Sequence, residues 1–208
     1  MYKITNSCDS HVVFTDTLFD AYEVAAVWTG ESHADVVEST VEAEDGSIWG
    51  GDDPLGAEED ACFGGIGFTI KATDVCTIDF TATIGGVTYD VVVASDATVV
   101  VECDERYIGI ARLAVLDGAV KVVIEEASFT GEDVDEEAAL ASAVLEHLRE
   151  TVGGELAATD GDEWESAQEA IVFFRQLTEV LGISWDFRSW SETGLALRGG
   201  RLGGVSFE

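Results

Sequence analysis

The sequence predicts an α+β fold, in which an antiparallel β-sandwich or flattened barrel is followed by two helices and a returning C-terminal strand. Over residues 66–129, apolar and polar residues alternate with a period of two, which is typical of strands with one buried face. Beyond residue 130, apolar residues recur every three or four positions, as they do in amphipathic helices. A run of strands followed by a run of helices favours a segregated α+β architecture.

Two short turns predict that the strands of residues 66–129 pair antiparallel. Gly85-Gly86 joins two alternating runs and fits a two-residue hairpin, and Asp117-Gly118 has the composition of a type I′ turn. The alternation also predicts which side chains of the first hairpin face the core. They are Cys76, Ile78, Phe80, Ala82 and Ile84 before the turn, and Val87, Tyr89, Val91 and Val93 after it.

Three further strands are predicted before this block, in residues 2–15, 22–28 and 37–43, the last being the weakest. Residues 44–65 contain the only proline, Pro54, and form the longest predicted loop. Trp49, Leu55 and Phe63 in this loop indicate that it packs on something, either its own domain or a neighbouring subunit.

Two helices are predicted in the C-terminal part. Asp133 and Glu136 make a variant of the capping box, and Gly153-Gly154 is expected to end the first helix. The second helix is predicted to begin near Asp162 and to end at Gly182. The apolar stripes of the two helices are Leu140, Val144, Leu145, Leu148 and Val152, and then Ala167, Ile171, Phe174, Leu177 and Leu181.

A strand is expected to return at residues 183–187, followed by a glycine-rich tail. Arg198 and Arg201 flank a diglycine in this tail, which fits either a closing hairpin or an arm exchanged between subunits. The predicted organisation is therefore an antiparallel β domain of residues 1–130. Residues 131–208 supply two helices and a C-terminal strand or arm that pack on it.

The charge balance is extreme, with 42 acidic residues against 10 basic ones and a net charge of −32. Such a chain repels itself at low salt, whereas at molar salt the Debye length shrinks to about 3 Å and the repulsion is screened. The composition resembles that of proteins from extreme halophiles with molar salt in the cytoplasm, such as haloarchaea and their viruses. An acidic nucleic-acid mimic or a cation buffer is the competing interpretation.

Charge and hydropathy also exclude some partners. There is no basic stripe to displace counterions, so no direct binding of nucleic acid is expected. No apolar run approaches the roughly 20 residues that span a bilayer, and no signal peptide is visible, so we expect no membrane partner and synthesis in the cytoplasm.

The four cysteines do not form a metal or redox motif. Cys8, Cys62, Cys76 and Cys103 include no CxxC pair, and nothing near Cys8 and His11 completes a zinc site. Cys76 and Cys103 fall in predicted strands and are expected to be buried. The even count permits disulfides, although a cytoplasmic origin argues against them.

The remaining polar residues give no catalytic pattern. His11, His33 and His147 accompany no serine in a nucleophile elbow, and His147 is expected on a helix surface. The acidic clusters at residues 52–53, 58–60 and 160–163 lack EF-hand spacing and are interpreted as hydrated surface. Neither a P-loop nor a dinucleotide-binding glycine motif is present. The sequence therefore predicts no catalytic, cofactor-binding or metal site.

A structural, self-assembling role is the function that these observations favour. A β-sandwich with a long loop, helices and an extended arm resembles the tail-tube and head–tail connector proteins of tailed viruses. This resemblance implies a virion protein of a haloarchaeal tailed virus, with copies of itself and other structural subunits as partners. One alternative is a cytoplasmic enzyme or ligand-binding domain, which a pocket lined by His11, His33 or Arg112 beside a carboxylate with a strongly shifted pKa would favour. Another is an acidic decoy or inhibitor of a basic partner, with one dense acidic face.

Overall fold

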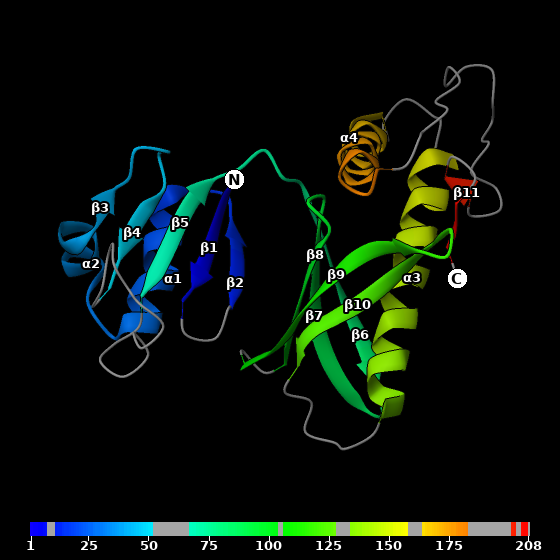
Figure 1. The fold of residues 1–208 in the computed structure, drawn as a ribbon, viewed down its shortest axis with the longest axis horizontal. Helices are drawn as coiled ribbons and strands as arrows, with labels where there is room; N and C mark the ends of the chain where they lie inside the picture. The colour runs from blue at the N-terminus through cyan, green and yellow to red at the C-terminus, as the bar shows by residue number, and fades with distance from the viewer. Residues whose placement is uncertain are drawn as a thin grey trace. The chain divides into compact units, whose positions relative to one another are not determined.

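The predicted α+β class is confirmed in the computed structural model (Figure 1). The structure describes residues 1–7, 11–51, 67–103, 106–127, 134–157, 164–182, 201–202 and 205–207. The chain divides into two compact units, Met1–Asp74 and Val75–Glu208, each with its own sheet and helices. The boundary expected near residue 130 falls inside the second unit, where helices and sheet share one core.

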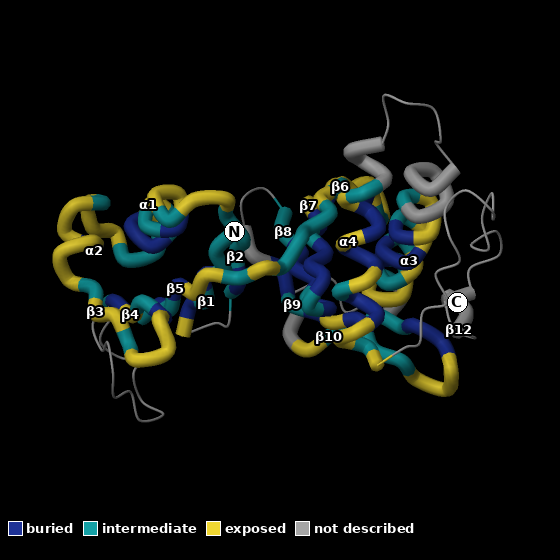
Figure 2. Tube along the Cα trace, turned by 90° about the horizontal axis from the view of Figure 1, so that it is seen from above, coloured by how far each residue is buried: buried dark blue, intermediate teal, exposed yellow. Residues whose placement is uncertain are grey.

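The first unit is a two-layer structure, with two helices on one face of an antiparallel sheet (Figure 2). The strand order is β2-β1-β5-β4-β3. The elements are β1 (Tyr2–Asn6), β2 (Val12–Thr15), α1 (Leu18–Thr29), α2 (His33–Ser39), β3 (Val41–Glu42), β4 (Ile48–Gly50) and β5 (Phe68–Ala72).

A row of cross-strand neighbours forms the inner face of this sheet. Ile48 pairs with Ile70, Ile70 with Ile4, and Ile4 with Val13, so four apolar side chains line up toward the helices. Ile4 and Ile70 are buried with three alanines of α1, whose small side chains let the helix approach the strands closely. The opposite face of the sheet therefore carries the alternate residues of each strand.

The strand predicted for residues 22–28 is wrong, because these residues belong to α1. Thr17 caps the helix by accepting a 3.1 Å hydrogen bond from the Asp20 amide, and Gly30 ends it in the left-handed region at a φ of 72°. Ala21 and Ala25 lie one turn apart and face the sheet. The apolar residues in this stretch fit both the two-residue period of a strand and the period of a helix. The capping residues at the two ends show that the helix forms.

The predictions on either side of α1 also need correction. Residues 37–43 contain the end of α2 and only two strand residues, because Ser32 caps a short helix by accepting a hydrogen bond from the Asp35 amide. Residues 2–15 form two antiparallel strands, β1 and β2, where a single strand was predicted. Within the loop predicted for residues 44–65, β4 forms at Ile48–Gly50, and residues 52–65 lie outside the described part of the chain.

The second unit contains a β-meander followed by two helices. The sheet order is β11-β12-β10-β9-β8-β7-β6. The elements are β6 (Thr77–Ile84), β7 (Val87–Ala94), β8 (Thr98–Cys103), β9 (Arg106–Leu116), β10 (Ala119–Ala127), α3 (Val134–Ala157), α4 (Trp164–Val180), β11 (Arg201–Leu202) and β12 (Val205–Phe207).

Both predicted hairpin turns are confirmed. Gly85 and Gly86 have φ angles of 60° and 88°, and Asp117 and Gly118 have φ angles of 56° and 78°. Positive φ at both central residues is the requirement of a type I′ turn. The strands that flank these turns pair antiparallel, β6 with β7 and β9 with β10.

The meander curves around α3, which contacts both β6 and β10 (Figure 2). The predicted inner face of β6 is confirmed, since Cys76, Ile78, Phe80, Ala82 and Ile84 all pack against the core. In β7, Tyr89, Val91 and Val93 are buried as predicted, whereas Val87, beside the turn, is 42% exposed. The helices fill the concave side of the sheet with Leu140, Val144, Leu148, Phe174 and Leu177.

The helix ends differ in part from the prediction. Helix α3 continues through Gly153 and Gly154, so the predicted stop there is wrong. Each glycine costs a helix about 1 kcal/mol relative to alanine, which weakens the helix without breaking it as proline would. Gly182 follows α4 with a φ of 66°, as predicted for its end.

The C-terminal strand is also present. Strands β11 and β12 pair antiparallel as a short hairpin, and β12 adds to β10 in parallel. Of the two forms expected for the tail, a closing hairpin or an exchanged arm, this arrangement is the closing hairpin. The strand predicted at residues 183–187 lies outside the described part of the chain.

Candidate functional site

The outer face of the second sheet, which points away from α3 and α4, carries an apolar row. Val92 pairs with Val100, and Val100 pairs with Ile110, across β7, β8 and β9. None of these three belongs to the core that the helices cover. Strand β8 is therefore apolar on both faces, as its run of buried Val99, Val100 and Val101 requires.

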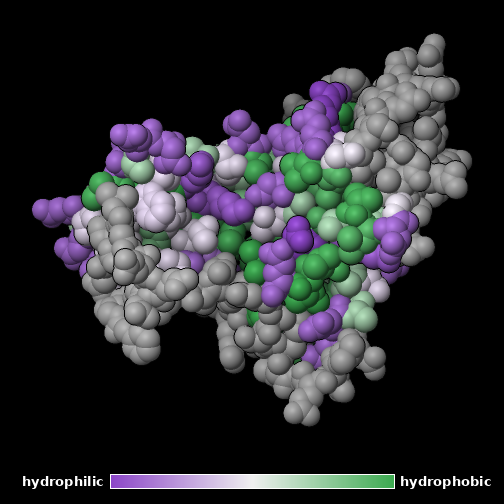
Figure 3. Space-filling model, in the orientation of Figure 1, coloured by the Kyte–Doolittle hydropathy of each residue, from purple (hydrophilic) through white to green (hydrophobic). Residues whose placement is uncertain are grey.

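The apolar character continues along β9 and β10. Ala114 and Val123 share the outer face with Ile110, and Leu116 at the end of β9 is 46% exposed. Figure 3 shows apolar surface over β9 and β10. Val100 is 3% exposed and is therefore already buried within the chain, whereas Val92, Ile110, Ala114 and Val123 are half-buried and Leu116 is well exposed. A sheet face in contact with water normally carries polar residues, so this partly exposed apolar row is unusual for an outer face. We call Val92, Val100, Ile110, Ala114, Leu116 and Val123 the outer apolar face.

A cavity of about 360 Å³ lies between strands β8, β9 and β10 and the end of α4. Its lining includes Arg112, Glu125, Asp96, Thr98, Val180 and Leu181. Arg112 Nε lies 2.6 Å from Glu125 Oε1, and both side chains are about half exposed, at 58% and 45%. The arrangement offers polar groups for binding, and Thr98 is the only hydroxyl in the lining.

Of the three residues named for the alternative of a ligand pocket, Arg112 lines this cavity. His11 and His33 belong to the first unit and pack on aromatic rings of α1 instead. His11 lies 5.2 Å from the Trp28 ring, and His33 lies 4.5 Å from Phe19 and 5.8 Å from Tyr22 between ring centroids. The Nε2 of His33 is buried without a hydrogen-bond partner, 3.9 Å from Glu23 Oε1.

His147 was predicted on a helix surface but stacks on a core residue. Its ring lies 3.9 Å from the ring of Phe80 at an interplanar angle of 13°. Burial lowers the pKa of His147 below its usual value, and the nearby carboxylate of Glu150 opposes this shift. The stack joins α3 to β6, which is a structural role.

Cys76 and Cys103 are free thiols on the second sheet, and both are partly buried. Burial raises the pKa of Cys76, and the charge of Glu169 raises it further. A thiol with a raised pKa is a poor nucleophile, which agrees with the predicted packing role. The Tyr89 hydroxyl also has a raised pKa, because of burial first and then the charges of Glu136 and Cys103.

The β3–β4 hairpin holds an ordered polar network that sequence analysis did not find. Asp45 Oδ1 accepts hydrogen bonds from the Ser47 hydroxyl at 2.5 Å and the Ser47 amide at 3.0 Å. Lys71 Nζ donates to Asp45 Oδ2 at 3.2 Å, and Trp49 Nε1 donates to Ser47 Oγ at 2.7 Å. The Ser47 hydroxyl, then the Ser47 amide and Lys71, lower the pKa of Asp45 to about 2.

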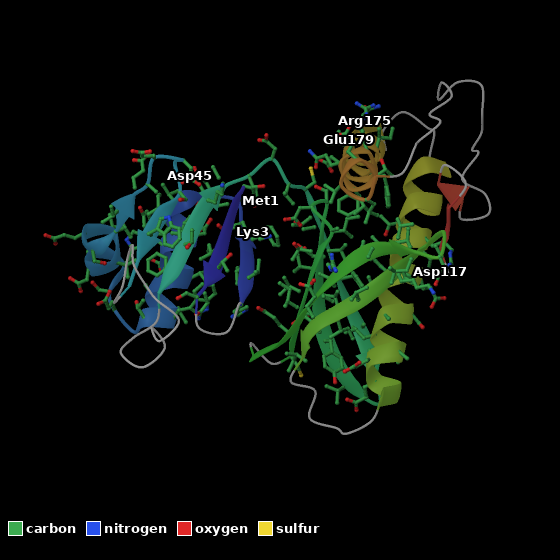
Figure 4. The ribbon with its side chains drawn as sticks, in the orientation of Figure 1. Met1, Lys3, Asp45, Asp117, Arg175 and Glu179 are labelled. Atoms are coloured by element: carbon green, nitrogen blue, oxygen red, sulfur yellow. The ribbon has the colours of Figure 1, made fainter. Side chains whose placement is uncertain are left out.

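Lys71 also lies directly opposite Lys3 in the register of β5 and β1. Both point to the outer face of the first sheet, where Lys3 Nζ lies 5.4 Å from the Phe14 ring centroid. Figure 4 labels Lys3 and Asp45 on the first unit. The chain has three lysines in all, and this face holds two of them. Only the register reveals this, because the two lysines are 68 positions apart.

Several predicted features lie outside the described residues. They are Cys8, Cys62 and the acidic clusters at residues 52–53, 58–60 and 160–163. In the part of the chain that the structure describes, no group of three or more histidine, cysteine, aspartate or glutamate side chains is placed to hold a metal ion. No helix in that part is long and apolar enough to cross a membrane.

Comparisons with known proteins give no neighbour for this chain. No family model, no curated protein and no solved structure matches it.

Proposed function

We propose that the protein is a structural, self-assembling subunit of a large particle. The observation that carries this proposal is the outer apolar face, in which Ile110, Leu116 and Val123 remain half-buried to exposed on the side of the sheet away from the helices. Burial of apolar surface contributes about 25 cal/mol per Å², so a neighbouring subunit gains stability by covering such a face. The partners in this proposal are copies of the same chain and other structural subunits.

The setting that we propose is the virion of a haloarchaeal tailed virus, as a tail or head–tail protein. The net charge of −32 supports a working environment of molar salt, where acidic surfaces stay hydrated and repulsion between subunits is screened. High salt also strengthens the burial of apolar surface between subunits. The virion setting rests on composition and on the resemblance of architecture described above.

Light scattering of the purified chain at several salt concentrations tests the proposal. We expect rings, tubes or larger assemblies in molar KCl, and smaller species as the salt is lowered and the subunits repel one another. Images of the assemblies in an electron microscope would show their symmetry. A monomer at every protein and salt concentration would contradict a self-assembling role.

A ligand-binding domain is the second candidate, and the cavity beside Arg112 favours it. Arg112 and Glu125 already neutralise each other there, which favours a small, largely uncharged polar ligand. Replacing Arg112 by Gln would weaken the binding of such a ligand and would leave assembly intact. Screening small molecules by thermal shift, with R112Q as the control, separates the two functions.

A further inference from the structure

The two sides of the first unit carry opposite charge. The outer face of its sheet presents Lys3 and Lys71, which are the only basic residues of the first 74. We call this the lysine face. On the same face, Val41 and Trp49 pair across β3 and β4 and are 41% and 36% exposed. The lysine face thus combines positive charge with apolar surface.

The helix side of the same unit is acidic. Five carboxylates lie on α1, α2 and the turn between them, and all are exposed: Asp20, Glu23, Glu31, Asp35 and Glu38. No lysine or arginine occurs between residues 4 and 70. Phe19 and Val27 on α1 are 61% and 80% exposed, so this side also offers apolar surface.

The register of β1 and β5 places the two lysines directly opposite each other. Like charges directly opposite each other in an antiparallel sheet destabilise the pair. Within the first unit, Asp45 lies 3.2 Å from Lys71, and both side chains remain more than half exposed, at 57% and 60%. An acidic surface placed over this face would offset the repulsion further, and the rest of the chain is rich in such surface.

We propose that the lysine face of one copy binds the acidic helix side of the first unit of a second copy. The inference rests on the self-assembly proposed above and adds a second contact to the one made by the outer apolar face. A symmetric contact of either side with itself would bring four lysines or ten carboxylates together. The contact is therefore heterologous, and repeated heterologous contacts generate rings or filaments.

Both sides also bring apolar residues to this contact. Trp49 and Val41 on one copy meet the surface that contains Phe19 and Val27 on the next. Long-range attraction is screened in molar salt, but pairs in direct contact are screened less, and apolar burial is strengthened. Charge therefore selects the orientation of the contact, and apolar burial supplies stability.

The test uses the full chain with both lysines neutralised, K3Q/K71Q. We expect the protein concentration at half-assembly in molar KCl, measured by light scattering, to rise about tenfold or more. The matched control is R175Q, which neutralises an exposed basic residue of α4 in the second unit, away from both proposed contacts. Circular dichroism checks that each variant is folded.

Mixing two variants tests the direction of the contact. E23K/E31K/E38K reverses charges on the helix side, avoids the capping residues Asp20 and Asp35, and keeps the lysine face. Its partner in the mixture is K3Q/K71Q, and both partners also carry I110T/V123T, which weakens the outer apolar face. Alone, each should then stay monomeric. Mixed, they should give a discrete heterodimer in ultracentrifugation, because one intact lysine face meets one intact acidic side and neither partner can extend further.

The outcomes separate the two proposals. If K3Q/K71Q assembles at the same concentration as the wild type, the lysine-face contact is overturned, while self-assembly through another surface stands. If the mixture gives no heterodimer, the heterologous contact is overturned. If the wild type never assembles in molar salt, both proposals fail.

Discussion

The Ser95 hydroxyl donates a 2.6 Å hydrogen bond to Oε1 of Gln176, which joins the turn after β7 to helix α4. The same hydroxyl oxygen accepts a 3.0 Å hydrogen bond from the Cys76 amide just before β6. Ser95 is 1% exposed, so one buried hydroxyl connects three segments of the second unit. Buried polar groups are nearly always paired, and this pairing fixes α4 against the sheet.

Replacing Ser95 by alanine should destabilise the second unit. The substitution leaves the Cys76 amide and the Gln176 amide oxygen without this partner, at a cost of about 1–3 kcal/mol. For a chain of this length, that corresponds to a fall in melting temperature of roughly 2–4 °C per kcal/mol. The matched control is S142A, because Ser142 donates only to the Ala138 carbonyl on the exposed side of α3. Equal melting temperatures for S95A and the wild type would contradict the structural role of this hydroxyl.

The stability of the first unit at low pH should depend on Asp45. Its folded pKa of about 2 lies below the usual value of 3.8 for an aspartate, so the carboxylate stabilises the fold above pH 4. This contribution is lost as the pH falls from about 4 to about 2. An NMR titration of the Asp45 carboxyl group measures the shift directly.

Variants distinguish the causes of the low pKa of Asp45. Hydrogen bonds from Ser47 contribute more than the charge of Lys71. We therefore expect S47A to raise the pKa of Asp45 more than K71Q does. We also expect the shift to persist in molar salt, where a purely coulombic shift would shrink. The opposite order for the two variants would show that the ion pair dominates.

His147 should make the second unit less stable in mild acid. Burial against Phe80 lowers its folded pKa, so the unfolded chain binds a proton at a higher pH than the folded chain does. Stability is then full above the unfolded pKa of about 6.5 and falls as the pH drops through the lower folded value. Melting curves at pH 8 and pH 5 measure the loss, which H147Q should reduce. The same pH dependence in H147Q would assign the effect to other groups.

The sequence predicted the second unit much better than the first. Strands β6 to β10 have strict alternation, and positive φ at Gly85-Gly86 and Asp117-Gly118 fixes their pairing locally. Helix α1 was missed because residues 22–28 alternate as well as recur at helical spacing. The deciding information was the pair of caps, Thr17 and Gly30, which lie outside the apolar pattern.

The candidate surfaces were less predictable, because they depend on pairing between distant residues. Lys3 and Lys71 become neighbours only through the register of β1 and β5. Val92, Val100 and Ile110 become a row only when three strands pair in one register. Arg112 was one of three residues named for the alternative of a ligand pocket, and its pairing with Glu125 follows from the β9–β10 register near a bulge.

The outer apolar face predicts how assembly can be weakened without unfolding the chain. In the variant I110T/V123T, two β-branched apolar residues become β-branched polar ones, which preserves strand preference. Threonine matches valine in size and is one heavy atom smaller than isoleucine. Neither Ile110 nor Val123 belongs to the core that the helices cover, so the melting temperature of the monomer should change little. If a neighbouring subunit covers this face, the concentration at half-assembly in molar KCl should rise by about tenfold or more, as measured by light scattering.

The matched control is V87T, a similar change at an exposed strand residue beside the Gly85-Gly86 turn, which should assemble like the wild type. Unchanged assembly of I110T/V123T would show that subunits meet through another surface.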